Sequence, residues 1–170
     1  MTLLGCQKND SISVYSVKKE KAESMISQTD REKTSLKWVL PKEWKEMAAT
    51  EMRILSVQIH SLPAKSLDFS VVKLAGDGGG LLMNVNRWRN QLELPPLTES
   101  ELQKVIHSQA LGGFSFKIVD ILSQNHQRES LVAILNLEGE SYFFKLTGEK
   151  EKVEKEKSHF YEFLKGLKRA

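Results

Sequence analysis

The chain of 170 residues contains one cysteine, Cys6, and only four prolines. A single cysteine cannot form a disulfide within the chain, and it excludes a zinc site built from several cysteines. No stretch approaches the roughly 18–20 apolar residues that a membrane-spanning helix needs. An excess of one charge is also lacking, because 25 basic and 22 acidic residues are largely interleaved and leave a net charge of +3. This balance argues against a nucleic-acid partner.

Residue patterns typical of catalytic or metal sites are lacking as well. The four histidines show no metal-ligand spacing, and none lies near a serine in the arrangement that hydrolases use. We therefore expect no metal, no cofactor and no enzymatic activity. One enzymatic alternative stays open, in which Arg87 or Arg89 holds a small anionic substrate and Asp77 acts as acid or base.

The segment Leu3-Leu4-Gly5-Cys6 has the residue order of a bacterial lipoprotein cleavage site. There the cysteine thiol receives a diacylglycerol and becomes the new N-terminus, so Cys6 is a candidate lipidation site. A complete signal has a basic start and about 7–15 apolar residues before that site. We expect that signal to be encoded upstream or to have been removed. The alternative is a cytosolic chain with a chance cysteine.

Three regions are expected along the chain. Residues 1–6 are interpreted as the remnant of a lipoprotein signal, and 7–35 as a disordered polar tether. The tether is rich in Ser, Lys and Glu, with too few apolar residues to offset the entropy of ordering. Residues 36–170 should form one globular domain, because 40% of the chain is hydrophobic and can supply a core without disulfides or metals.

Six segments carry the apolar patterns of β-strands: 37–40, 52–59, 67–74, 114–122, 130–137 and 141–147. The last two are joined by the loop Glu138-Gly139-Glu140, which favours an antiparallel hairpin. Because 131–135 is apolar on both faces, we expect that strand to be covered on both sides.

Three helices are expected. The first places Leu81, Val85, Trp88 and Leu92 on one face, and Pro95-Pro96 ends it. The second begins at Thr98, whose hydroxyl and Glu101 form a capping box. The third runs from about 149 to 167. The order β-β-β-α-α-β-β-β-α predicts an α+β fold, with a mainly antiparallel six-stranded sheet flanked by helices.

The order of elements resembles the PsbP-like α/β/α sandwich, beginning with an aromatic strand that runs into Pro41-x-x-Trp44. The run Gly78-Gly79-Gly80, the block 84–89 (Asn-Val-Asn-Arg-Trp-Arg) and the segment 143–148 (Phe-Phe-Lys-Leu-x-Gly) resemble a group of uncharacterised bacterial lipoproteins. The likeness covers roughly 36–167. PsbP-like proteins assist photosystem assembly and oxygen evolution, but no residue here carries over a metal or photosystem site.

The candidate ligand or partner surface comprises a glycine loop and an adjoining helix face: Asp77, Gly78, Gly79, Asn84, Asn86, Arg87 and Arg89. A glycine loop that opens a helix can bind phosphate through backbone amides, although Asp77 would repel an anion. Arginine can bind a carboxylate or phosphate through two hydrogen bonds. The alternative is structural: the glycines supply a turn, and the asparagines and arginines tie the loop to the helix.

These features favour a lipid-anchored, non-enzymatic binding or accessory module of the cell envelope. Its partners would be the membrane, through the lipid, and an envelope protein or a small anionic ligand. Gln7 follows Cys6 where an aspartate commonly directs inner-membrane retention, so in a Gram-negative host the outer membrane is the expected location, with another extracytoplasmic membrane surface as the alternative. A cytosolic interaction domain is the alternative if Cys6 carries no lipid.

Overall fold

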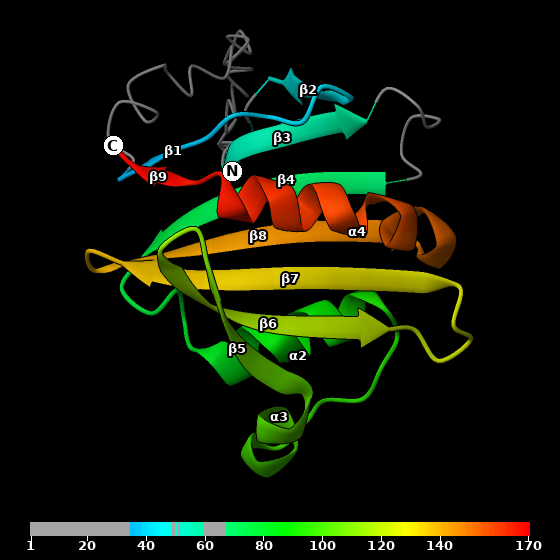
Figure 1. Cartoon of the computed structure of the whole chain (residues 1–170). Helices are drawn as coiled ribbons and strands as arrows, with labels where there is room; N and C mark the ends of the chain where they lie inside the picture. The colour runs from blue at the N-terminus through cyan, green and yellow to red at the C-terminus, as the bar shows by residue number, and fades with distance from the viewer. Residues whose placement is uncertain (1–34, 49, 51, 60–66) are drawn as a thin grey trace, which may run out of the picture.

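The structure, a computed structural model, describes residues 35–48, 50, 52–59 and 67–170 (Figure 1). Cys6 and most of the predicted tether therefore lie outside the described residues. The strands are β1 (Leu36–Lys37), β2 (Trp44–Met47), β3 (Arg53–Ile59), β4 (Leu67–Ala75), β5 (Ile106–Leu111), β6 (Phe114–Leu122), β7 (Arg128–Leu137), β8 (Glu140–Glu149) and β9 (Lys168–Arg169). The helices are α2 (Leu81–Gln91), α3 (Glu99–Val105) and α4 (Lys150–Lys165).

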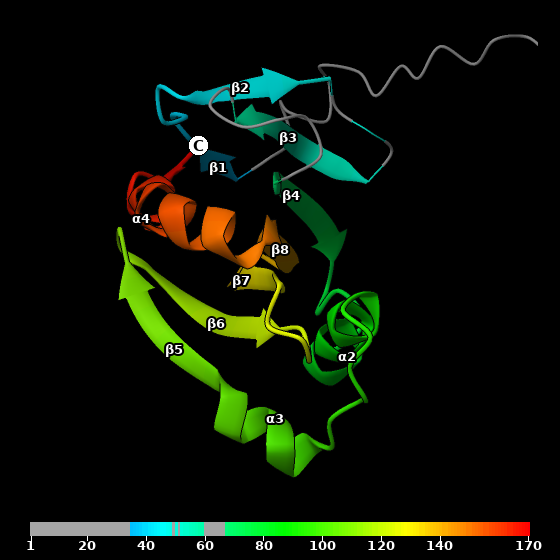
Figure 2. The same ribbon diagram turned by 90° about the vertical axis from the view of Figure 1, so that its right-hand side faces the viewer.

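Seven strands form one sheet in the order β2-β3-β4-β8-β7-β6-β5, and all neighbouring strands are antiparallel. Figure 2 shows α4 on one side of this sheet and α2 with α3 on the other. The predicted α+β sandwich is therefore confirmed, with seven strands in the main sheet instead of six. No helix of the described residues has the length and apolar character needed to cross a bilayer.

Aromatic side chains form much of the core beneath α4. The Trp44 ring lies 4.5 Å from the Phe69 ring and 6.0 Å from the Phe163 ring, measured between centroids. The Trp44 indole also donates a hydrogen bond of 2.9 Å to Glu156 of α4. Because aromatic pairs add to the stabilisation from burial, Trp44 joins the edge of the sheet firmly to α4.

Strand β7 is covered on both faces, as its apolar sequence predicts. Leu131, Ala133 and Leu135 face the α4 core, whereas Val132 and Ile134 face the core beneath α2. Alternate residues of a strand point to opposite sides of a sheet, so one strand serves both cores.

Both helices on the other face begin and pack as expected. Val85 and Trp88 of α2 are buried against the sheet, as the helical spacing predicts. At α3, the Thr98 side chain accepts from the Glu101 amide while the Glu101 carboxylate accepts from the Thr98 amide, which confirms the capping box.

Two edges of the sheet differ from the prediction. The strand expected at 37–40 reduces to Leu36–Lys37, which pairs with β9 outside the main sheet. Trp44, which lies beyond the expected strand 37–40, begins the edge strand β2. Ile106 follows α3 directly and starts β5, a strand that is not among the six expected ones. Pairing with a distant segment decides the position of β1, because β9 lies at the opposite end of the domain sequence, whereas β2 and β5 pair with the strands that follow them in the sequence.

The two tight hairpins use left-handed backbone conformations. Gly112 and Gly113 connect β5 to β6 with φ of 57° and 85°, and Glu138 and Gly139 connect β7 to β8 with φ of 54° and 78°. Two consecutive positive φ values are typical of two-residue type I′ turns, which match the twist of paired strands. The expected three-residue loop 138–140 is thus a two-residue turn, because Glu140 already pairs with Leu137.

The ends of the domain meet beside the β7–β8 turn. The amide of Ala170 donates a hydrogen bond of 3.0 Å to the carbonyl of Ser35. Ser35 also donates through its amide to the Tyr142 hydroxyl and through its own hydroxyl to Glu138. Together with the β1–β9 pairing, these contacts form a clip that closes the fold where the N-terminal segment joins it.

Candidate functional site

The glycine loop, residues 76–80, is tied to α2 by Asn84. The Asn84 amide donates hydrogen bonds of 2.8 Å to the carbonyls of both Gly78 and Gly80. Asp77 accepts a hydrogen bond from the Gly79 amide, which closes the loop on itself. Asn84 is 3% exposed, so it is buried beneath the loop and does not lie on an accessible face of the helix.

Gly78 is the glycine that this loop requires. Its φ is +65°, and an added Cβ would lie 2.6 Å from a ring atom of Phe143. At Gly79 an added Cβ would meet nothing within 4 Å. The loop therefore packs its backbone onto Phe143, and these glycines have a structural use that a phosphate site does not explain.

Asn86 and Arg89 hold the connection between α2 and α3. The Asn86 side chain donates to the Leu97 carbonyl at 3.0 Å and accepts from the Leu97 amide at 2.7 Å. Arg89 donates through Nε to the Pro95 carbonyl at 2.8 Å. Both side chains satisfy backbone groups of an irregular segment, in accord with the structural alternative for these two residues.

Arg87 differs from its neighbours because it is exposed and faces a groove. Within the described part of the chain, its side chain makes one hydrogen bond, donated from Nη2 to the Asn84 side-chain oxygen at 2.7 Å. Of the predicted surface, Arg87 is the residue that lines this groove. The other six predicted residues lie in the glycine loop or make the bonds described above, and the assignment of all seven residues to ligand binding stays an untested prediction.

We call this groove the α2 groove. It has a volume of about 680 Å³ and runs between α2 and strands β3, β4 and β8. Val72, Leu74, Trp88 and Phe143 provide its apolar surface. The Trp88 and Phe143 rings meet edge to face, with centroids 5.7 Å apart. Volume and lining are typical of small-molecule sites, which combine apolar walls with a few polar groups.

Three cationic side chains line the same groove, from three different elements. Arg53 of β3 is neutralised by Asp68 through two hydrogen bonds of 2.8 and 3.0 Å. Lys145 of β8 donates to the Gln91 side-chain oxygen at 3.1 Å. Among the described residues, no carboxylate lies within salt-bridge distance of Arg87 or Lys145. Among the residues that the structure describes, these two cations of the groove therefore have no anionic partner.

Burial lowers the pKa of Lys145 below its ordinary value, because a half-buried ammonium group loses hydration. The Asp68 carboxylate opposes this change in pKa. The sequence analysis did not identify Lys145 or Arg53 as site residues. Phe143 and Lys145 are two residues apart and therefore lie on the same face of β8. Only the pairing of β8 with β4 shows that this face borders a groove.

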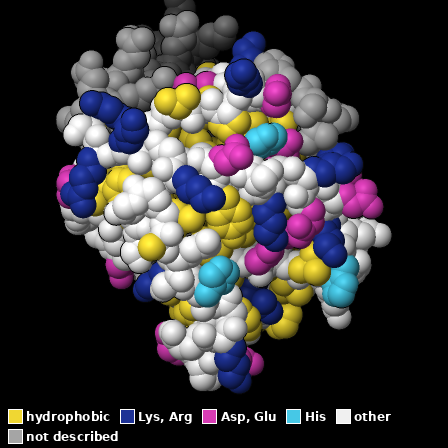
Figure 3. Space-filling model, in the orientation of Figure 1, with side chains coloured by type: hydrophobic (Ala, Val, Ile, Leu, Met, Phe, Trp, Pro, Cys, Tyr) yellow, Lys and Arg dark blue, Asp and Glu magenta, His cyan; other side chains and the backbone are white. Residues whose placement is uncertain are grey.

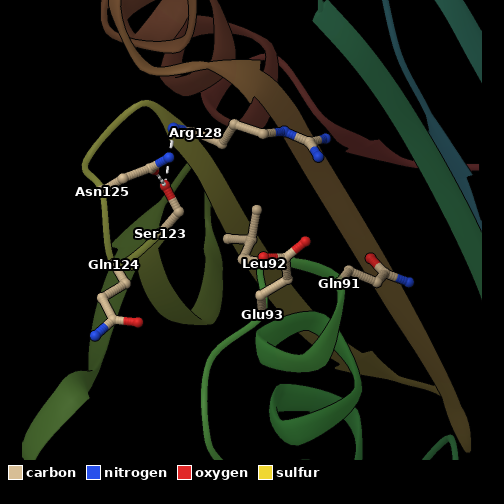
Figure 4. Close-up of a pocket in the computed structure, with 7 residues that line it drawn as sticks. All are labelled: Gln91, Leu92, Glu93, Ser123, Gln124, Asn125 and Arg128. Atoms are coloured by element: carbon tan, nitrogen blue, oxygen red, sulfur yellow. Dashed lines mark hydrogen bonds between the residues drawn. The ribbon is translucent and has the colours of Figure 1, made fainter.

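A second, smaller cleft of about 470 Å³ lies where α2 ends (Figure 4). It is lined by Gln91, Leu92, Glu93, Ser123, Gln124, Asn125 and Arg128. Figure 4 shows the Arg128 side chain extending toward Gln91, while Ser123 and Asn125 bond to one another. Apart from Leu92, the lining is polar, and both signs of charge are present. The α2 groove is the better candidate, because its unpaired cations lie beside apolar walls.

The described residues of the opposite face carry charges of both signs. Figure 3 shows this α4 side, where basic and acidic side chains are interspersed among apolar ones. Within the described part of the chain, no group of three or more His, Cys, Asp or Glu residues is placed to hold a metal ion.

No protein-family model matches this chain, and no curated protein matches it in sequence. Solved structures do match. Cyanobacterial PsbP (CyanoP) from Synechocystis sp. PCC 6803 is similar with a TM-score of 0.52 and 12% identity, over 80% of this chain and 87% of that one. A protein from Bacteroides thetaiotaomicron VPI-5482 gives 0.51 and 13%, over 80% of this chain and 45% of that protein, less than half its length.

LpqN of Mycobacterium tuberculosis, described as involved in cell envelope biogenesis, gives a TM-score of 0.45 and 13% identity, over 78% of this chain and 81% of that one. That score is too low to support an argument. The two better matches, at 12% and 13% identity, show the fold alone. The chain therefore has a PsbP-like α+β sandwich fold.

Proposed function

We propose that this chain is a non-enzymatic binding module and that the α2 groove binds a small anionic ligand. The observation that carries the proposal is the pair of unpartnered cations, Arg87 and Lys145, beside the apolar surface of Trp88 and Phe143. Each cation bonds only to a neutral amide oxygen within the described residues.

The energetics of a half-buried ammonium group support an anionic ligand. A charge removed from water is costly unless a counter-charge or strong hydrogen bonds compensate it. Gln91 supplies Lys145 with one neutral acceptor, whereas an incoming carboxylate would supply a counter-charge together with an acceptor. Arg87 is exposed and can offer several donors to the same anion.

The proposal includes a location. Lipidation of Cys6 would place the module on an extracytoplasmic membrane surface, with the outer membrane expected from Gln7. Its support is the residue order Leu3-Leu4-Gly5-Cys6, the absence of other cysteines and the polar segment that follows. An envelope protein that docks over the same groove is the second candidate partner.

Ligand binding can be tested by thermal unfolding with organic anions, including citrate, glycerol phosphate, benzoate and dodecanoate. We expect at least one of them to raise the Tm of the wild-type protein and to lose this effect in Lys145→Met. Lys117→Met is the matched control, because Lys117 is an exposed strand lysine outside the groove. Equal Tm shifts in Lys145→Met and wild type, or no shift with any anion, would contradict the proposal.

The lipid anchor has an independent test. When the natural gene with its upstream codons is expressed in a bacterial host, the protein should incorporate labelled palmitate. Cys6→Ala should remove the label without changing the fold of residues 36–170. Unlabelled wild-type protein would rule out the lipid anchor and leave the groove unaffected.

A further inference from the structure

The α2 groove changes from polar to apolar along its length. Ser70 of β4 pairs with Lys145 of β8, and two residues further along, Val72 pairs with Phe143. Leu74 follows after another two residues, each such step being about 7 Å along the strand. Because alternate residues share a face, these side chains form one row with a cation at one end and an apolar surface at the other.

The apolar end of this row is accessible. Val72 and Leu74 are only half-buried, although the neighbouring core residues Phe69 and Val71 are fully buried. Met52 borders the groove with 61% of its surface exposed. Its flexible and polarizable side chain adapts readily to an apolar ligand. This end of the groove therefore offers apolar contacts that no described side chain takes up.

The two ends of the groove together constrain the chemistry of the ligand. A small polar anion would neutralise Lys145 and Arg87 but leave the surface of Val72 and Leu74 in water. A neutral lipid would cover that surface but leave both cations without a counter-charge. Only a ligand with an anionic head and an apolar body complements both the cations and the apolar surface.

We infer that the α2 groove binds an acyl-chain carboxylate, with its head between Lys145 and Arg87 and its chain along Phe143, Val72 and Leu74. This inference rests on the proposed function and specifies its ligand class. A volume of about 680 Å³ lies within the range of about 300–1,000 Å³ that small-ligand sites occupy, which suits a single chain. Met52 would cover the chain from the side of β3.

The test is isothermal titration of straight-chain carboxylates from octanoate to dodecanoate, each kept below its micelle concentration. We expect affinity to rise two- to fourfold per added methylene, the upper figure corresponding to about 0.8 kcal/mol of transfer free energy. Dodecanol and dodecyltrimethylammonium should bind at least tenfold more weakly than dodecanoate, because neither supplies an anion.

A pair of exposed methionines provides matched variants. Met52→Glu places a carboxylate beside the apolar end and should weaken dodecanoate binding at least tenfold. Met83→Glu, at a methionine of α2 that is 70% exposed and does not line the groove, should leave binding unchanged. Both sites are at the surface, so neither variant is expected to unfold the protein.

The outcomes separate this inference from the proposed function. One contrary result is that citrate or glycerol phosphate binds in a way that depends on Lys145, while the affinity of the carboxylates does not change with chain length. That result would overturn the inference of an acyl-chain ligand but would retain the proposed anion site. Dodecanol that binds as tightly as dodecanoate would overturn the role of the head group. Failure of every anion to bind would overturn both proposals.

Discussion

At the scale of single residues, Glu129 of β7 is the most unusual ionisable group. Its side chain is 2% exposed, and neither carboxylate oxygen has a hydrogen-bond partner within the described structure. Asp120 of β6 faces it, as do Glu154 and Lys157 of α4, and Lys157 Nζ lies 3.6 Å from Glu129 Oε1. Burial first, and then repulsion from Asp120, raises the pKa of Glu129 to about 7.

This pKa predicts how stability depends on pH. In the folded protein Glu129 retains its proton up to about pH 7, whereas in the unfolded chain it loses the proton near 4.5. The free energy of unfolding should therefore fall as pH rises from 4.5 to 7. Glu129→Gln should flatten this change and be about 1–3 kcal/mol more stable than wild type at pH 8.

Urea denaturation at a series of pH values measures this effect. Glu154→Gln is the control, because Glu154 also pairs with Lys157 but is 48% exposed. If Glu129→Gln kept the wild-type slope between pH 4.5 and 7, the raised pKa would be wrong. Lys157 stays charged over this pH range. Burial lowers its pKa, but the hydrogen bond to Asp120 and the nearby carboxylates raise the pKa by more, so the net shift is upward.

At the scale of elements, the β5–β6 hairpin meets the end of α4 very closely. A Cβ added to Gly112 would lie 2.4 Å from the carbonyl oxygen of Lys165, and φ at Gly112 is +57°. Gly113 has φ of +85°, but an added Cβ there would meet nothing within 4 Å. A substitution at Gly112 would therefore meet both backbone strain and a steric clash, whereas one at Gly113 would meet backbone strain alone.

We expect Gly112→Ala to destabilise the protein by about 2–4 kcal/mol, since it combines a left-handed conformation with a backbone clash. Gly113→Ala should cost only about 1 kcal/mol, from the conformation alone. Chemical denaturation of the two variants measures the difference. Equal losses would mean that the hairpin does not press against α4 as described.

Elements whose pattern is local could be predicted from the sequence, and those that depend on distant pairing could not. The capping box at Thr98 and the helical row of Val85 and Trp88 need only neighbouring residues, and both are confirmed. Strand β5 was missed, although Gly112-Gly113 between apolar residues is a local hairpin signal that could have identified it.

The same distinction applies to the candidate site. Arginines and asparagines in a short helical block drew attention to Arg87, which does line the α2 groove. Lys145 lies 58 positions later in the sequence, on a strand whose register with β4 no local pattern reveals. The structural bonds of Asn86 could not be predicted either, because they depend on the path of an irregular connection.

At the scale of the whole molecule, the fold should not require residues 1–34. We expect a chain that begins at Ser35 to melt within about 2 °C of the full-length protein, because apolar residues are sparse in the removed segment. Removal of residues 168–170 should lower Tm more, since it breaks the β1–β9 pairing and the bond from Ala170 to Ser35. A loss of several degrees in the first variant would contradict the tether assignment.

The clip between Ser35 and Ala170 determines where a tag fused to the C-terminus lies relative to the N-terminal segment. A fluorophore or affinity tag at the C-terminus leaves the fold beside the point where the N-terminal segment enters it. The turn after β6 lies at the other end of the ten-residue strand β7, about 30 Å away. In a protein anchored through Cys6, a C-terminal tag should thus lie beside the attachment of the tether, whereas a tag inserted near Gln124 should lie at the far end of the domain.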